Sequence, residues 1–383
     1  MSAIIPLEIL FIMRFRAHYT MRDNIKMQTW PDRRLLELLK LDIPIIQAPM
    51  AGSDSVALAR SVSSTGALGS LACALLSPDE VREAVRRLRH EMGRPFNLNF
   101  FCHRMEAPDR DAIDNWKKFL TPHYERLGLD IESVAESRLR LPFNDEMCAV
   151  VEDVRPEIAS FHFGLPEPKL VERLKGHDIK ILSSATSVRE AKWLESRGCD
   201  AIIAQGVEAG GHRGMFLERN IATQVGLFAL LPQVKEAVSV PIIAAGGIAD
   251  ARGVVAAFAL GASGVQLGTA YLSCPEANVS PLYRHALAQV ADNGTVLTNL
   301  FSGRPARGIV NRYLQESGPM SEVAPAFPYA ATLVGPLRAA SERAGSLDYM
   351  QLWAGQAAGL AKSMPADQFT RTLAADVLSN LHK

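Results

Sequence analysis

Short apolar runs alternate with longer amphipathic segments between residue 42 and about residue 270. The runs are rich in β-branched residues, and the segments between them have the length and periodicity of helices. This alternation is typical of repeated strand–helix units. The eight predicted strands are Ile43–Gln47, Ala67–Leu71, Phe96–Phe100, Ile158–Phe163, Lys180–Ser183, Ala201–Gln205, Pro241–Ala245 and Gly264–Gly268. Eight such units predict a closed (β/α)8 barrel.

Residues that begin and end helices lie between these strands. Ser77 and Pro78 have the residue types that open a helix, and the amphipathic segment Ser187–Arg197 ends before Gly198.

The competing architecture is an open doubly wound sheet, which would normally carry a GxGxxG motif after its first strand. Here the first strand runs into the segment Gln47-Ala-Pro-Met-Ala-Gly52. We therefore favour the α/β TIM barrel.

Three regions do not fit the repeat. We expect residues 1–29 to be an N-terminal extension outside the fold, and the segment 4–13 is too short and too interrupted by Glu8 for a signal peptide or membrane anchor. The barrel is expected over 30–274, with a charged helical insertion at about 104–141. Residues 275–383 are expected to form a helical addition beside the C-terminal mouth of the barrel that closes the active site.

Composition narrows the classes of function. Lys plus Arg and Asp plus Glu both number 41, so no excess of positive charge favours nucleic acid or an anionic membrane, and neither partner is expected. The cysteines are widely spaced, without a CxxC motif or a His/Cys cluster, which predicts no metal site and a reducing, cytoplasmic location. Those cysteines are Cys73, Cys102, Cys148, Cys199 and Cys274.

Polar and glycine-rich segments follow several predicted strands, and the active site of such a barrel lies at the C-terminal ends of its strands. These segments are Pro49–Gly52, Asn97–Asn99, Gln205–His212, Ala245–Gly247 and Gln266–Thr269. The last two follow strands seven and eight, where barrels commonly bind a phosphate group with backbone amides. Each glycine alone would equally suit a tight turn, but the two segments together favour a phosphate-bearing cofactor.

Two histidines are candidates for proton transfer. His212 lies on a loop between Gly211 and Gly214, after a strand, where an imidazole near neutral pH suits a catalytic base. A surface loop histidine is the alternative interpretation. His162 lies between Phe161 and Phe163, which favours a satisfied, packed histidine. No paired carboxylates, Ser-His-Asp arrangement or GxSxG motif supports a hydrolase.

The order of these motifs resembles the nitronate monooxygenase family, formerly called 2-nitropropane dioxygenases. The resemblance covers the chain from about Trp30 to the C-terminal helices. It rests on the segments Gln47–Gly52, Asn99, Phe161–Pro166, Gln205–Gly214, Ala245–Gly247, Gln266–Thr269, Phe301–Gly308 and Leu352–Gln356. At Ala245 some relatives carry a serine that contacts the phosphate, so that hydroxyl contact is missing or replaced here.

The resemblance implies an FMN cofactor, with its phosphate on the amides of Gly247, Gly268 and Thr269 and its ring system against Met50 and Ala51. The residues implied at the cofactor are Ala48, Pro49, Met50, Ala51, Asn99, Gln205, Gly210, Gly211, Ala245, Gly246, Gly247, Gln266, Leu267, Gly268 and Thr269. It also implies that His212 is the catalytic residue, and that nitronates or nitroalkanes react with O2 to give a carbonyl compound and nitrite without NAD(P)H. A homodimer is left open.

Two rival functions remain. A flavin-dependent NAD(P)H reductase, for enoyl-acyl carrier protein or quinone, has the same barrel and a glycine-flanked histidine. The enoyl reductase, however, typically has Gln-Gly-Gly-Met where this chain has Gln-Ala-Pro-Met at 47–50, which favours the monooxygenase. The other rival is a barrel that binds FMN or phosphate without catalysis, in which His212 would be inert.

Overall fold

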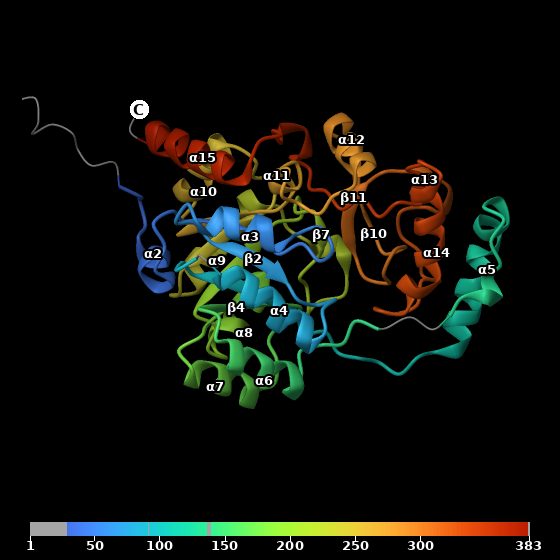
Figure 1. The fold of residues 1–383 in the computed structure, drawn as a ribbon, viewed down its shortest axis with the longest axis horizontal. Coiled ribbons are helices and arrows are strands. Elements are labelled where there is room, and N and C mark those ends of the chain that lie inside the picture. Colours follow the sequence, from blue (N-terminus) through green and yellow to red (C-terminus); the bar gives the residue numbers. More distant parts are fainter. Residues whose placement is uncertain (1–28, 91, 136–138, 382–383) are drawn as a thin grey trace, which may run out of the picture.

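The computed structural model in Figure 1 describes residues 29–90, 92–135 and 139–381. Apart from Thr29, the extension predicted for residues 1–29 lies outside the described residues. Trp30 anchors the start of the barrel region: it is 8% exposed, donates a hydrogen bond from its indole nitrogen to the Asp42 carbonyl at 3.2 Å, and packs against Phe258.

Eight parallel strands form the barrel, and all eight predicted strands are confirmed with small shifts at their ends. They are β1 (Ile45–Gln47), β2 (Gly69–Ala72), β3 (Phe96–Phe101), β4 (Ile158–His162), β5 (Lys180–Ala185), β6 (Ala201–Gln205), β8 (Ile242–Ala245) and β9 (Gly264–Leu267). They are ordered β1-β9-β8-β6-β5-β4-β3-β2, and a parallel bridge between Ile46 and Leu68 joins the two ends. The architecture is therefore the predicted (β/α)8 TIM barrel.

Helices surround the strands because each presents an apolar face to the sheet. They are α2 (Arg34–Leu39), α3 (Val56–Ser63), α4 (Pro78–Arg89), α6 (Asp145–Val154), α7 (Pro168–Gly176), α8 (Val188–Glu195), α9 (Leu227–Ala237), α10 (Ala251–Ala259) and α15 (Ala366–Leu381). The short helices η2 (Ile221–Thr223) and α11 (Thr269–Leu272) lie in loops after strands. The predicted helix start at Ser77 is a capping box with Glu80. The last helix, α15, packs against α10 and α3 and so completes the ring of helices.

The insertion and the C-terminal segment form a lobe beside the barrel (Figure 1). Its elements are α5 (Arg110–Arg126), η1 (Ile131–Ser133), α12 (Pro281–Gln289), β10 (Thr295–Thr298), β11 (Ala306–Ile309), α13 (Arg312–Ser317), α14 (Ala330–Arg343) and η3 (Ala358–Leu360). Trp116 and Tyr124 of α5 share a buried cluster with Val334 of α14 and with Tyr349. The insertion and the C-terminal segment, which are far apart in the sequence, therefore share one hydrophobic core.

Beyond residue 274 the structure contains strands as well as the predicted helices. β10 and β11 form an antiparallel sheet in the order β10-β11-β7, in which β7 is only Gly211–His212. Ala306 pairs with His212 across this sheet. A two-residue strand has no alternating pattern of its own, so its pairing with a partner far along the chain could not be predicted locally. In the described part of the chain, no helix has both the length and the apolar character to cross a bilayer.

Candidate active site

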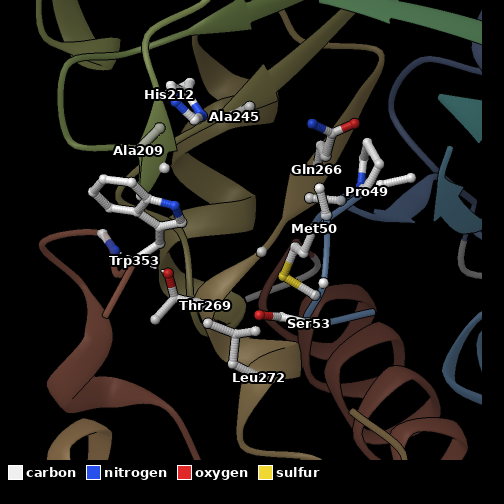
Figure 2. Close-up of a pocket in the computed structure, with 18 of the residues that line it drawn as sticks. Pro49, Met50, Ser53, Ala209, His212, Ala245, Gln266, Thr269, Leu272 and Trp353 are labelled. Carbon is white, nitrogen blue, oxygen red and sulfur yellow. Dashed lines mark hydrogen bonds between the residues drawn. The ribbon is translucent and has the colours of Figure 1, made fainter. Parts of the chain in front are cut away.

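A cavity of about 600 Å³ opens at the C-terminal ends of the barrel strands and is flanked by residues of the lobe. Figure 2 shows His212 and Trp353 on one side of this cavity, with Met50 and Gln266 on the other. All predicted site residues except Leu267 line it. Leu267 instead belongs to the barrel core and is 1% exposed, because successive residues of a strand point to opposite faces.

Backbone amides at the ends of β8 and β9 form one wall. Gly246 and Gly247 have φ values of +110° and +68°, a conformation that favours glycine. The N–H groups of Gly247, Gly268 and Thr269 have no hydrogen-bond acceptor within the described chain. All three residues line the cavity, so this wall offers unused donors of the kind that bind a phosphate group.

The loop after β1 is held by a buried carboxyl group. One oxygen of Asp54 accepts hydrogen bonds from the amides of Met50 and Ala72, each at 2.8 Å. Burial raises the pKa of Asp54 to about 7. Elsewhere in the cavity wall, the side-chain oxygen of Gln266 is buried without a hydrogen-bond partner among the described residues. A ligand with a donor at its polar edge would satisfy that oxygen.

His212 is positioned by β7 and by a serine from the lobe. Its Nε2 lies 2.8 Å from the hydroxyl of Ser302, and that hydroxyl donates to the carbonyl of Arg304 at 3.2 Å. We assign the serine proton to this carbonyl, so that the hydroxyl accepts from Nε2–H of His212 and from the Arg304 amide at 3.4 Å. The imidazole is then the Nε2 tautomer, and its Nδ1 keeps an unshared electron pair.

Aromatic rings surround this imidazole. The ring centroids of Phe101, Phe163, Phe327 and Trp353 lie 5.6 to 6.2 Å from that of His212. Such neighbours leave the partly buried ring in apolar surroundings, which strengthen electrostatic interactions at it. A charge on a bound ligand therefore has a larger effect here than it would have in water.

The same surroundings keep His212 neutral. Burial, followed by the positive charge of Arg140 and the groups at His162 and Arg304, holds the pKa of His212 well below its usual range. The neutral imidazole is the form that can accept a proton. The nearby positive charges also favour an anionic ligand at this end of the cavity.

His162 has a different environment, although it also lines the cavity. Its Nδ1 lies 3.0 Å from the hydroxyl of Ser184, and its Nε2 lies 3.1 Å from the carbonyl of His212. A carbonyl only accepts, so Nε2 carries the proton and Nδ1 accepts from the serine. Burial lowers the pKa of His162 to about 3. Both nitrogens are therefore used by the protein itself.

The carboxamide of Gln205 holds the loop that carries His212. Its side-chain nitrogen donates to the His212 carbonyl at 3.0 Å, and its side-chain oxygen accepts from the Gly214 amide at 2.8 Å. Gln205 also lines the cavity, as a cofactor contact would require. The structure adds a second role for this side chain, because both ends of its carboxamide have partners in the protein.

Gly210 permits a close approach of the lobe. A Cβ at this position would lie 2.5 Å from the Gly355 nitrogen and 2.6 Å from the Ala354 carbonyl carbon. The Gly355 amide donates to the hydroxyl of Thr269 at 2.9 Å. Gly210 and Gly355 therefore serve a backbone contact between barrel and lobe.

Sequence reasoning missed several residues of the site. Ser302 lies in the segment 301–308, for which no role was predicted, and its contact with His212 depends on the pairing of β7 with β11. Arg140 and Arg338 also line the cavity. Isolated arginines on a loop and on a helix carry no pattern that would have identified them.

Comparisons with known proteins identify the family of this chain. The family model described as nitronate monooxygenase matches residues 32–376. The nitronate monooxygenase of Paraburkholderia phytofirmans is 40% identical over 92% of this chain and 96% of that protein, and a probable nitronate monooxygenase of Staphylococcus aureus is 36% identical over 92% and 98%. The structure of a nitroalkane oxidase from Streptomyces ansochromogenes has a TM-score of 0.83 at 36% identity and covers 91% of this chain and 100% of that one. This chain belongs to the nitronate monooxygenase family of enzymes.

Proposed function

We propose that this protein is an FMN-dependent monooxygenase that oxidises alkyl nitronates, such as propionate 3-nitronate, with O2 to a carbonyl compound and nitrite. The observation that carries the proposal is the arrangement at His212. This neutral imidazole has one nitrogen bonded to Ser302 and the other unshared, and it lies in a cavity with positive charges nearby.

The residues present fit an FMN. The unused amides of Gly247, Gly268 and Thr269 would hold its phosphate, and the buried, unpartnered oxygen of Gln266 would accept from a donor of the ring. Met50 lines the cavity on the same side as Gln266 and would contact the ring. When bound, the flavin supplies the electron acceptor for oxidation of the nitronate.

The chain's own residues bind and orient the substrate. A nitronate is an anion, and the positive charges of Arg140 and Arg304 near His212 favour it. Toward a neutral nitroalkane, Nδ1 of His212 would remove the α-proton. Toward a nitronate, which has already lost that proton, the imidazole would contribute to binding. The aromatic rings around His212 make this region less polar and so strengthen these electrostatic interactions.

The test uses purified protein with its flavin. Under anaerobic conditions we expect propionate 3-nitronate to change the flavin absorbance and NADH to leave it unchanged. In air, O2 uptake and nitrite formation with the nitronate should follow. Bleaching by NADH without any response to the nitronate would instead assign a reductase, and a protein that binds no FMN after attempted reconstitution would overturn the proposal.

We also propose a cytoplasmic location. All five cysteines are free, which suits a reducing compartment. Four of them are buried and behave as small apolar side chains of the core. Fractionation of cells followed by detection of the protein in the cytoplasmic fraction is the corresponding test.

A further inference from the structure

Two arginines face the cavity outside the set of residues assigned from the sequence. Arg140 lies at the end of the insertion, Arg338 lies on α14, and both line the cavity while being partly buried. Neither guanidinium group forms a hydrogen bond or an ion pair within the described chain. A partly buried cation without such a partner is unfavourable, so two of them in one cavity indicate a site for an anion.

Their charges act on each other. Burial lowers the pKa of Arg140 to about 10, with the positive charge of Arg338 as the second cause. The carboxylate of Glu342, one turn further along α14, also lines the cavity and partly offsets the charge of Arg338. Glu342 is exposed, however, and does not come within ion-pair distance of Arg338. An anion bound between the two guanidinium groups would relieve the remaining repulsion.

Arg140 lies close to the proposed base. The guanidinium carbon of Arg140 is 6.0 Å from the centre of the Phe327 ring, and the His212 ring centre is 5.6 Å from the centre of the same ring. Arg140 and His212 therefore both border one phenyl ring. The charge of Arg140 also acts on the His212 imidazole, so one ligand in this cavity can meet both residues.

We propose that Arg140 and Arg338 bind a carboxylate of the substrate and so determine a preference for nitronates that carry a second negative charge. This inference rests on the proposed nitronate oxidation and names the residues that select among its substrates. Guanidinium groups suit this role because their planar set of donors matches the two oxygens of a carboxylate.

The experiment compares propionate 3-nitronate with propyl-1-nitronate, in which a methyl group replaces the carboxylate. In Arg140→Gln, Arg338→Gln and the double variant, we expect kcat/KM from O2 uptake to fall about 10- to 100-fold for the carboxylated substrate, as for loss of a charged hydrogen bond. For propyl-1-nitronate we expect little change in Arg338→Gln and a clearly smaller fall than for the carboxylated substrate in the variants that lack Arg140, whose charge also acts at His212. Wild-type FMN content and Tm show that each variant is folded. Arg343→Gln is the matched control, because Arg343 ends the same helix and is exposed.

A binding measurement separates this inference from the proposed function. Succinate carries two carboxylates and does not need to react, so it should raise the Tm of the FMN-loaded wild type and of Arg343→Gln, but not of the double variant. If the protein bound succinate in this way yet oxidised no nitronate, the anion site would stand and the proposed reaction would fail. Equal losses for both nitronates, or an unchanged response to succinate in the double variant, would overturn the assignment.

Discussion

The barrel and the lobe contribute to the same cavity in different ways. The barrel supplies backbone: the amides at Gly247, Gly268 and Thr269 stand at the ends of strands. The lobe supplies side chains, including Ser302 and Trp353, which contact His212 from outside the barrel. The proposed cofactor side therefore depends on the geometry of the backbone, whereas the substrate side depends on particular side chains from distant parts of the sequence.

The strongest test of this comparison is His212→Asn. General-base catalysis typically contributes about 10²- to 10⁴-fold, so we expect kcat/KM for a neutral nitroalkane to fall by that range. The preformed nitronate should lose much less, because its α-proton is already gone. The measurement is O2 uptake with both substrates at matched flavin content.

His162→Asn is the paired control. Both nitrogens of His162 are bonded to the protein, so this variant should lower Tm and affect the two substrates alike. A loss selective for the nitroalkane in His162→Asn, and not in His212→Asn, would move the base to β4.

On the barrel side, Gly268→Ala tests the phosphate assignment. Gly268 has an ordinary φ of −107°, and an added Cβ would lie 3.5 Å from Ala48 and 3.7 Å from the Met50 sulfur, both ordinary contacts. The backbone should therefore tolerate alanine, unlike at Gly247. We expect FMN to bind about 10- to 100-fold more weakly, from crowding of about 1–3 kcal/mol, measured by flavin fluorescence.

Gly176→Ala provides the control for that substitution, since a Cβ there would have nothing within 4 Å. It should retain wild-type FMN affinity. If Gly268→Ala also kept wild-type FMN affinity, the assignment of the phosphate to the end of β9 would be wrong.

Beside the lobe's Phe327, His103 is a buried histidine at 4% exposure. Burial, followed by the charge of Arg304, lowers its pKa to about 4, below the unfolded value near 6.5. As the pH falls below 6.5, His103 becomes protonated in the unfolded chain while it stays neutral in the folded chain. Its contribution therefore lowers the free energy of unfolding progressively as the pH falls from about 6.5 to 4. At pH 5.5 the cost is about 1 kcal/mol. His103→Phe should remove it.

The measurement is the difference in unfolding free energy between His103→Phe and wild type, from urea denaturation at pH 7.5 and 5.5. Taking this difference cancels the contribution of Asp54, whose raised pKa acts in the opposite direction. The variant should gain about 1 kcal/mol relative to wild type between the two pH values. A difference that does not vary with pH would show that His103 titrates normally in the folded state.

The smallest expected effect belongs to Ser302→Ala. Loss of one hydrogen bond of about 0.5–1.5 kcal/mol corresponds to a few-fold to tenfold fall in kcat/KM for a nitroalkane. Ser302→Thr, which keeps a hydroxyl, should restore the rate. The decisive measurement is the pH dependence of kcat/KM. A shift of its acid limb in Ser302→Ala, but not in Ser302→Thr, indicates an effect on the His212 imidazole. Identical pH profiles would mean that Ser302 only packs against the ring.

How much of the fold and the site could be predicted from the sequence also differs between the barrel and the lobe. The eight strands and the cavity positions of Gly247 and Thr269 were predictable because strand period and strand-end glycines are local signals. The cavity position of Gln205 was predictable too, but its bonds to the segment 212–214 were not, since they depend on how the loop folds back. Ser302 and Arg338 were missed because their roles depend on contacts between segments far apart in sequence.

The position of α15 has a consequence for the order in which the chain is made. All eight barrel strands leave the ribosome before this helix, which packs against both α10 and α3. A nascent chain that ends after β9 therefore leaves apolar surface of α3 and α10 uncovered, and its His212 lacks the β11 strand that fixes it. The ring of helices is complete only once α15 has been synthesised. A chain truncated after β9 therefore lacks a helix that the complete barrel has.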